Sequence, residues 1–439
     1  MADYRIFFNR YPILMLTVPF LRDNRDQVIK QLAIKHFTDT KLIDSILEAD
    51  RRRRELQVNT NDLQAEMNNL SSQIGELFRQ GEKERAEQVK TRTAEIKEEI
   101  KKGENELNEL AGQITDLLVQ VPNVPHPGVP AGNSETDNEL VREGGSSPEL
   151  PPEAMPHWEL GKKYDILDFD LGVKITGAGF PVYKGWGARL QRALISWFLD
   201  ENEQQGYREF LPPLLVNEAS GFGTGQLPDK EGQMYHIPSD NYYLIPTAEV
   251  PVTNIYRDCI LEEKDLPVKN TAYTPCFRRE AGSYGKEVRG LNRVHQFDKV
   301  EIVQICQPEH SYRILEEMVE HVESLVKQLG LPYRILKLCG GDISFTSALT
   351  YDFEVYAAAQ GRWLEVSSVS NFESYQANRL KLRYRPDGEK KPRLVHTLNG
   401  SALALPRIVA AIMENNQEEN GIVIPEVLQP YMRGRERME

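Results

Sequence analysis

The sequence predicts an α+β fold with a long helical arm near its N-terminus. Two stretches with a heptad spacing of apolar residues lie within residues 40–119, and a short polar break separates them. The C-terminal part, residues 157–439, contains strand-like runs that follow one another with few helical segments between them. Regular alternation of strands and helices would have indicated a parallel α/β sheet, so this order favours α+β.

The composition sets the broad class of protein. A chain of 439 residues is long enough for two or three domains, and its formal net charge is −13. The average surface should therefore repel nucleic acid, so any RNA contact must use local basic patches. The four cysteines have neither metal-ligand spacing nor the density of a disulfide framework. No segment approaches the ~20 apolar residues of a membrane span. We therefore expect a cytoplasmic enzyme with reduced thiols and no membrane partner.

The N-terminal apolar run does not read as a signal peptide. Residues 11–21 follow two arginines and are largely apolar, which mimics one. Two prolines interrupt the run and no small-residue cleavage site follows it, so we expect no cleaved leader.

Residues 40–119 are predicted to form an antiparallel helical hairpin. Apolar residues recur at alternating intervals of four and three in both halves, which is the seam of a coiled coil. Gln80-Gly81-Glu82 interrupts the spacing, and Gly81 suits the left-handed conformation that ends many helices, so the chain can reverse there. Two helices of about 35 residues would make a rod of roughly 50 Å.

Basic residues of the arm are the candidates for RNA contact. Residues 51–54 are four consecutive arginines. The second helix adds dispersed cations, namely Lys83, Arg85, Lys90, Arg92, Lys97, Lys101 and Lys102. Many acidic residues lie between them, so charge alone leaves an ordinary solvated helix face as the alternative.

Residues 122–156 are predicted to be a linker. Four prolines end the second helix, and a stretch rich in Gly, Ser, Pro and Glu follows. In the globular part beyond it, strands are expected at 210–216, 242–245, 297–306, 333–339, 352–357 and 363–369. Helices are expected at 186–203, 309–329 and 406–415.

Seven short segments of the C-terminal half carry the candidate chemistry. In chain order they are residues 247–249, 277–282, 295–301, 365–368, 370–373, 399–401 and Arg407. The planar fork of arginine grips phosphate, a phenylalanine ring can stack on adenine, and oxygen ligands suit Mg²⁺. Each segment alone is equally consistent with a strand edge or a surface turn. Their order and spacing together resemble the signature set of seryl-tRNA synthetases, a class II family.

The resemblance runs from Met15 to the C-terminus and implies the fold and domains. It implies an antiparallel β-sheet catalytic domain of the class II synthetase type over residues 157–439. It also implies an N-terminal tRNA-binding domain over residues 15–121, which includes the coiled-coil arm. Residues 1–14 then form a possible N-terminal extension that should be dispensable.

The resemblance also assigns the site residues. It implies three catalytic residues, which are Arg278, Arg407 and Glu301. The implied ATP contacts are Arg278, Arg279, Glu280, Val294, Phe297, Glu365, Val366, Ser367, Ser368 and Arg407. The implied L-serine contacts are Thr247, Ala248, Glu249, Arg278, Glu301, Asn399 and Ser401. Glu365 and Ser368 are the implied Mg²⁺ ligands.

The implied activity is that of a serine–tRNA ligase. The family activates L-serine with ATP to seryl-adenylate and pyrophosphate, then transfers serine to the 3′ end of tRNA(Ser), and commonly also of tRNA(Sec). By the same resemblance the protein is a homodimer with its interface near residues 187–213. No protein nucleophile is needed, because positioning and charge stabilisation carry the catalysis.

Two other functions are consistent with parts of the sequence. One is a synthetase paralogue that loads serine or another small amino acid on a carrier protein, but such relatives lack the long arm. The other is a non-catalytic coiled-coil RNA-binding scaffold, yet Arg278, Glu280, Glu301 and Arg407 are all retained.

The chain departs from the family pattern at a few places. Ala402 stands where the family usually has glycine, and Leu405-Pro406 where it has Val-Gly. Asn378 replaces a common arginine, and the segment 177–180 lacks another. We expect these changes to affect peripheral contacts and to leave the chemistry in place.

Overall fold

The structure is a computed structural model that describes residues 17–280 and 289–439. The chain divides into two compact units, of which one is residues 16–122 and the other includes residues 123–439. The expected extension, residues 1–14, lies outside the described residues, as do Met15 and the end of the second motif, Ala281-Gly282.

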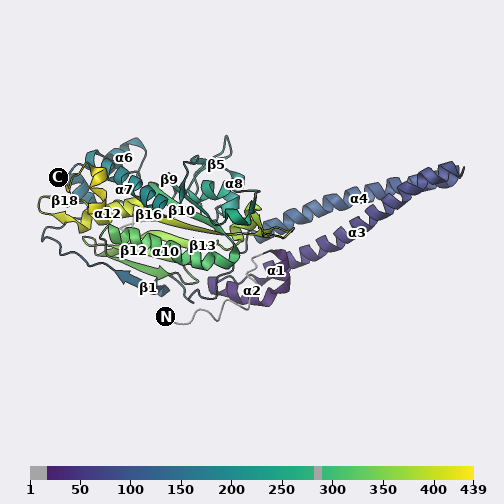
Figure 1. The fold of residues 1–439 in the computed structure, drawn as a ribbon, viewed down its shortest axis with the longest axis horizontal. Coiled ribbons are helices and arrows are strands. Elements are labelled where there is room, and N and C mark those ends of the chain that lie inside the picture. Colours follow the sequence, from purple (N-terminus) through teal and green to yellow (C-terminus); the bar gives the residue numbers. More distant parts are fainter. Residues whose placement is uncertain (1–16, 281–288) are drawn as a thin grey trace. The chain divides into compact units, whose positions relative to one another are not determined.

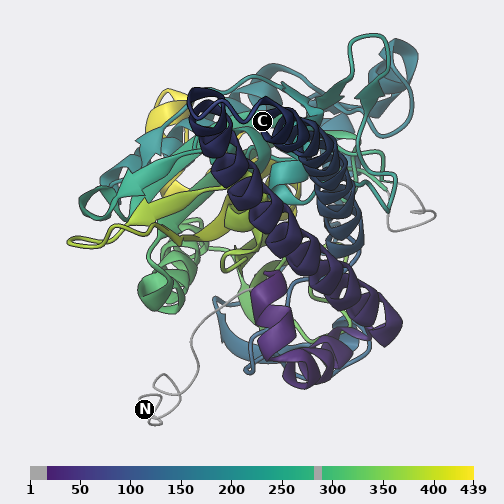
Figure 2. The same cartoon turned by 90° about the vertical axis from the view of Figure 1, so that its right-hand side faces the viewer.

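The first unit is helical throughout. Its elements are α1 (Val18–Asp23), α2 (Arg25–Leu32), a 3₁₀ turn at Ala33–Lys35, α3 (Thr40–Arg79) and α4 (Lys83–Leu118). Figures 1 and 2 show α3 and α4 running side by side. Asp39 caps α3 by accepting a hydrogen bond from the Leu42 N–H. Gly81 has φ +81° at the reversal, as the sequence predicts.

Cross-helix contacts show that α3 and α4 are antiparallel. Arg52, early in α3, lies 3.5 Å from Glu106, late in α4. Arg92, early in α4, lies 3.2 Å from Glu66, later in α3, so the two helices run in opposite directions. The apolar seam between the helices contains the buried side chains of Ile96, Ile100, Leu110 and Ile114. The predicted hairpin is therefore confirmed, and apolar burial along this seam stabilises it.

The second unit is built on an eight-stranded sheet in the order β1-β11-β12-β13-β16-β10-β9-β4. In that order the strands are Glu139–Gly144, Tyr333–Lys337, Leu349–Ala357, Arg362–Asn371, His396–Ala404, Gln296–Cys306, Val268–Phe277 and Arg208–Glu209. Neighbours pair antiparallel, except that β4 runs parallel to β9. The mainly antiparallel sheet confirms the predicted fold class.

Three long helices cover the sheet, and all three are close to their predicted bounds. These are α7 (Gly185–Gln204), α10 (Ser311–Gln328) and α12 (Leu405–Asn415). The α10 helix packs on β13 and β16, whereas α12 packs on β10 and β12 (Figure 1). Their apolar faces are buried, as the spacing of their apolar residues predicts.

Short elements surround this framework. The helices are α5 (His157–Lys163), α6 (Phe169–Ile175), α8 (Glu218–Thr224), α9 (Glu249–Asn254) and α11 (Tyr375–Leu380). The strands are β2 (Leu167–Asp168), β3 (Val182–Tyr183), β5 (Leu215–Asn217), β6 (His236–Ile237), β7 (Tyr242–Leu244), β8 (Ile260–Glu262), β14 (Arg383–Arg385), β15 (Arg393–Leu394), β17 (Gln417–Glu418), β18 (Gly421–Val423) and β19 (Arg437–Met438). In the part of the chain that the structure describes, no helix is both long and apolar enough to cross a membrane.

Four segments differ from the expectation. The expected linker contains β1, which pairs with β11 at the edge of the sheet. The expected strand at 210–216 is a strand only from Leu215, because the two prolines at 212–213 remove ladder donors. The central strands β9 and β16 were not predicted. Pro275 interrupts the pattern of β9, and Asn399-Gly400 in β16 reads as a turn signal.

Candidate active site

The candidate residues converge on neighbouring strands of the large sheet. Arg278 directly follows β9, and Glu301 lies on β10. The third-motif residues lie on β16 and α12, and the expected metal ligands lie on β13. The order β13-β16-β10-β9 is continuous. Segments separated by up to 160 positions, Thr247 and Arg407 at the extremes, therefore meet on one part of the sheet.

Glu301 is the centre of the polar cluster. Only 1% of it is exposed. Its Oε2 accepts a hydrogen bond from Thr247 Oγ1 at 2.8 Å and lies 2.5 Å from Lys299 Nζ. Its Oε1 accepts from Asn399 Nδ2 at 2.6 Å and from Ser401 Oγ at 3.5 Å. Three of the predicted serine contacts, Thr247, Asn399 and Ser401, are thus hydrogen-bonded to the fourth, the buried carboxylate of Glu301. Such a cluster of donors and acceptors can bind a small polar ligand specifically.

Lys299 is a site residue that the sequence analysis missed. It is 6% exposed, pairs with Glu301 and donates a hydrogen bond to Thr247 Oγ1 at 2.9 Å. A buried carboxylate is costly without a partner, and this ammonium supplies one. The signal was available, because residues two apart on a strand share a face.

Glu249 is a second buried carboxyl group beside the first. It begins α9 and is 6% exposed. Its backbone N–H donates to Thr247 Oγ1 at 3.2 Å, and its Oε1 accepts from Gln376 Nε2 at 2.5 Å. Burial raises the pKa of Glu249 to about 7, and the negative charge of Glu301 adds to the rise. The carboxyl is therefore poised to ionise fully when a cation binds.

Binding of an ammonium ligand at Glu249 should depend on pH. Ammonium binding favours the ionised carboxylate, whereas below about pH 7 the free site is increasingly protonated. Lys299 and Arg278 favour ionisation and Glu301 opposes it. We therefore expect the Kd for L-serine to rise as pH falls, approaching about tenfold per unit below the midpoint. Calorimetric titration between about pH 6 and pH 8 measures this. A Kd that stays flat over that range would contradict the role given to Glu249.

Ala248 and the segment 370–373 contribute no side chain to the cluster. Ala248 packs in a buried group with Val252, Ala272 and Val303, so only its backbone can face a ligand. Within 370–373, Asn371 donates to Ser311 Oγ at 3.1 Å, which ties the segment to α10.

Arg278 stands at the end of β9 next to the predicted adenine platform. Its guanidinium lies 5.3 Å from the centre of the Phe297 ring, and its Nε donates to Pro246 O at 3.3 Å. The adjacent strand holds its backbone, because the Arg278 N–H donates to His295 O at 2.9 Å. Apart from that one long contact, the planar fork has no hydrogen bond from its side chain among the described residues, so it is free for phosphate.

The other predicted ATP contacts near Arg278 have partners of their own. Arg279 lies over the Tyr235 ring, 5.6 Å from its centre. Glu280 adopts φ +46° and pairs with Arg293 at 3.2 Å. Val294, just before the return strand β10, is 5% exposed. Of these predicted contacts, the structure brings Arg278 and Phe297 directly together.

Arg407 connects α12 to the predicted metal ligands. Its Nη1 donates to Glu365 O at 2.6 Å and lies 3.5 Å from Glu365 Oε2, while its Nε donates to Asn292 O at 2.9 Å. Ser368 Oγ lies 3.5 Å from Glu365 Oε1. The cation, carboxylate and hydroxyl that the sequence predicts for phosphate and metal binding are therefore adjacent.

Asp352 adds an unexpected acceptor to this group. It faces Ser368 across β12 and β13, and its buried Oδ1 has no hydrogen-bond partner in the described part of the chain. Burial, and after it the negative charge of Glu365, raise the pKa of Asp352 well above its usual range. An orphaned oxygen beside a carboxylate and a hydroxyl fits the oxygen preference of Mg²⁺. Within the described residues, no three or more His, Cys, Asp or Glu side chains are grouped so that they could hold a metal ion by themselves.

Two further residues of β13 lie between the Glu365–Ser368 pair and the polar cluster around Glu301. Val366 and Ser367 are 1% and 2% exposed. Ser367 Oγ donates to Ser401 O at 2.6 Å, so this hydroxyl links the metal side to the Glu301 side. Both residues can reach a nucleotide only through their backbone.

The departures from the family pattern are accommodated inside the fold. Ala402 and Leu405 are fully buried, and Pro406 lies in the first turn of α12, where its missing N–H costs nothing. Leu403 adopts φ +73° where the β10–β16 register shifts, which indicates a bulge. Arg407 keeps its contacts beyond this bulge.

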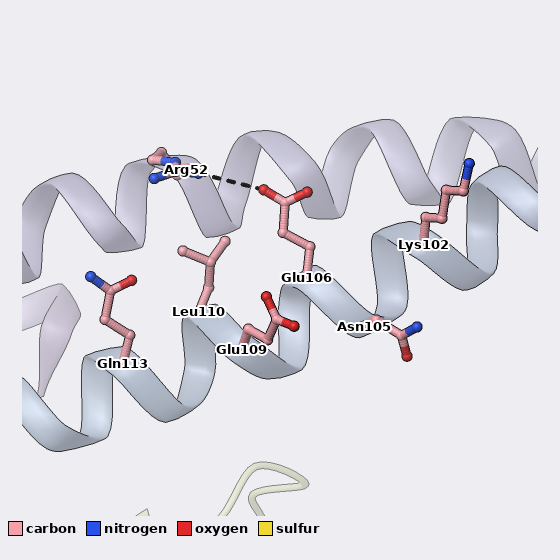
Figure 3. A pocket seen from close by; sticks show the side chains of 7 residues that line it. All are labelled: Arg52, Lys102, Asn105, Glu106, Glu109, Leu110 and Gln113. Carbon is pink, nitrogen blue, oxygen red and sulfur yellow. Dashed lines mark ion pairs between the residues drawn. The ribbon is translucent and has the colours of Figure 1, made fainter.

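The basic run 51–54 of the arm is largely neutralised by neighbouring carboxylates. Arg51 pairs with Glu48 and Glu55, and Arg53 and Arg54 both pair with Asp50. A groove of about 380 Å³ runs beside it (Figure 3). Its lining residues are Arg52, Lys102, Asn105, Glu106, Glu109, Leu110 and Gln113. Figure 3 shows the ion pair of Arg52 with Glu106 across it. Because cations and carboxylates balance here, the groove is no anion site.

Exposed lysines on α4 remain for phosphate contact. Lys97, Lys101 and Lys102 are exposed and have no ion pair within residues 17–280 and 289–439. Lys97 and Lys101 are four residues apart and share a face of the helix. They are the strongest RNA candidates on the arm.

Comparison with known proteins agrees with the division of the chain into a helical arm and a sheet-based core. A model of the seryl-tRNA synthetase N-terminal domain matches residues 15–125, and one of the class II tRNA synthetase core domain (G, H, P, S and T) matches residues 235–416. A serine–tRNA ligase from Salinibacter ruber is 51% identical over 418 residues, 95% of this chain and 98% of the relative. One from Geobacter sulfurreducens is 53% identical over 324 residues, 73% and 77% of the two chains. Seryl-tRNA synthetase from Pyrococcus horikoshii, solved in complex with ATP, is 34% identical with a TM-score of 0.89, covering 97% of this chain and 99% of that one.

Proposed function

We propose a residue-level mechanism from the premise that the chain belongs to the seryl-tRNA synthetase family, whose members are class II aminoacyl-tRNA ligases. The activity is the ATP-dependent ligation of serine to tRNA. The observation that carries the site assignment is the convergence of Thr247, Asn399 and Ser401 on the buried carboxylate of Glu301.

The first step forms seryl-adenylate. A carboxylate oxygen of serine attacks the α-phosphorus of ATP, the new C–O–P linkage forms, and the bond to the β-phosphate oxygen breaks to release pyrophosphate. Arg278 binds the α-phosphate and Arg407 the γ-phosphate, because both carry guanidinium groups beside the adenine platform and the metal ligands. Catalysis is positioning and charge stabilisation, and no protein nucleophile takes part.

Serine selection uses both buried carboxyl groups. Glu249 and Thr247 receive the ammonium, and Glu301 with Ser401 receives the hydroxyl. Lys299 already neutralises Glu301, which leaves Glu249 as the carboxyl group that lacks a cationic partner and fits the substrate's positive charge. A site that hydrogen-bonds a substrate hydroxyl rejects analogues lacking it by roughly 10⁴ or more, because its polar groups are left unpaired.

Glu365 and Ser368 would hold Mg²⁺, with Asp352 beside them. When bound, the ion neutralises phosphate charge. Phe297 would stack on the adenine, and Glu280, which also pairs with Arg293, would receive the adenine amino group. Arg407 is held beside the proposed metal ligands by its hydrogen bonds to the backbone oxygens of Glu365 and Asn292.

The second step transfers serine to RNA. A hydroxyl at the 3′ end of tRNA attacks the carbonyl carbon of seryl-adenylate, and AMP leaves. The proposed acceptors are tRNA(Ser) and also tRNA(Sec), with the lysines of α4 contacting phosphates. The proposed compartment is the cytoplasm.

We also propose a homodimer. The segment near residues 187–213 contains Leu211, whose exposed fraction is 84%, beside two prolines. An apolar side chain so exposed in a structured segment suits burial against a second copy.

Replacing Glu301 with alanine should impair serine use more than ATP use. The change leaves Lys299, Thr247 and Asn399 without their shared acceptor, while Phe297 and Glu280 remain. We expect the KM for serine to rise at least 100-fold, with the KM for ATP within about threefold. Separate titrations of the two substrates in pyrophosphate exchange measure this. If only the ATP titration changes, the role of Glu301 is wrong.

A further inference from the structure

Gln376 is hydrogen-bonded to the carboxylate of Glu249 and has no role in any assignment made above. It is 1% exposed on α11. One amide hydrogen goes to Glu249 Oε1 at 2.5 Å and the other to Thr224 O, at the end of α8, at 3.2 Å. Its Oε1 accepts from Thr397 Oγ1 at 2.7 Å.

These three contacts define the orientation of the amide. A flipped amide would set its oxygen against two acceptors, Glu249 and the Thr224 carbonyl, and its NH₂ group against the Thr397 hydroxyl. The donor therefore faces Glu249 in the arrangement that satisfies every partner. A donor at this place stabilises the ionised carboxylate over the protonated form.

We propose that Gln376, oriented by Thr397, is a positioning residue that holds the carboxylate of Glu249 ready for the ammonium group of the amino-acid substrate. Gln376 lies behind the carboxylate and acts through Glu249. This inference rests on the proposed function, because it assumes that Glu249 receives the ammonium.

The alternative is that Gln376 only ties α11 to α8. A structural tie would lower stability without separating the two substrates. A positioning role raises the KM for serine and leaves the KM for ATP unchanged, because the hydrogen bonds of Gln376 within the described residues go to Glu249, Thr224 and Thr397 and not to the predicted nucleotide contacts.

The experiment compares full-length Gln376→Met with wild type in ATP–pyrophosphate exchange. Methionine preserves volume and removes all three hydrogen bonds. We expect the KM for serine to rise roughly 10- to 100-fold and the KM for ATP to stay within about threefold. The pH midpoint of serine binding should move upward, because ionised Glu249 loses a donor.

Thr397 supplies a second, milder test. Thr397→Val removes the orienting hydroxyl at constant shape, and we expect roughly a 3- to 10-fold rise in the KM for serine. Thr397→Ser retains the hydroxyl and should restore the wild-type value. This pair decides the question if Gln376→Met does not fold.

Gln304→Met is the matched control. Gln304 lies on β10 and is also 1% exposed, and its amide donates a hydrogen bond to the Tyr207 hydroxyl at 2.7 Å. The Gln304→Met change should lower the melting temperature without changing either KM.

Three outcomes would overturn the inference. They are equal changes in both KM values of Gln376→Met, an unchanged KM for serine in a folded Gln376→Met variant, and no rescue by Thr397→Ser. A wild-type protein without serine-dependent exchange would instead defeat the proposed function.

Discussion

Arg278→Ala should abolish serine activation while leaving the fold intact. The guanidinium lies beside the Phe297 ring, and its side chain makes one hydrogen bond within residues 17–280 and 289–439, to Pro246 O at 3.3 Å. Removing it therefore costs the fold little. Removing one preorganised charge donor from a transition state costs roughly 10²–10³ in rate, and we expect at least that loss in exchange.

The control for this change is Arg278→Lys, which keeps the charge and loses the planar fork. It should recover only part of the activity. Thermal unfolding of both variants should match wild type within a few degrees. Near-normal exchange in a folded Arg278→Ala variant would remove this residue from the mechanism.

Shortening the arm should separate the two half-reactions. Thr60 and Gly103 face each other across the hairpin, since a Cβ on Gly103 would lie 2.7 Å from Thr60 Oγ1. Deleting residues 61–102 and joining these two through a short Gly-Asn-Gly turn keeps the first part of α3, which packs on α1, and the last part of α4. The deletion removes Lys97, Lys101 and Lys102.

We expect exchange to survive within about tenfold, because none of the adenylation residues lies on the arm. Transfer to tRNA should collapse, because the groups that position the RNA are gone. Equal loss of both half-reactions in a folded variant would count against the arm as an RNA-positioning element.

A charge variant refines this test without altering the rod. Replacing Lys97, Lys101 and Lys102 with glutamine should reduce the salt slope of tRNA binding by up to about three. Arg51→Gln is the matched control, because its charge is already engaged by Glu48 and Glu55. It should leave the slope unchanged.

The sequence predicts those parts of the protein that depend on local pattern. The hairpin follows from heptad spacing and Gly81, and α7, α10 and α12 follow from their apolar faces. The strands β9 and β16 were missed because proline and Asn-Gly signals are local, whereas their pairing on both sides is tertiary. The edge strand β1 was missed for the same reason.

The same division applies to the site. Glu301, Asn399 and Ser401 could be predicted from motif order, and the structure brings them together. Lys299 is two residues from Glu301 on the same strand, so the alternation of strand faces could have predicted that the two side chains are neighbours. Gln376 was not, because its contact with Glu249 joins residues 127 positions apart.

The measurement that tests the central claim most directly is ATP–pyrophosphate exchange with purified full-length protein and single amino acids. The account predicts rapid exchange with L-serine and discrimination against alanine, which lacks the hydroxyl, by roughly 10⁴ or more in kcat/KM. Absence of serine-dependent exchange, or alanine used within about tenfold of serine, would contradict the assignment of Glu301, Asn399 and Ser401 as the serine-reading groups.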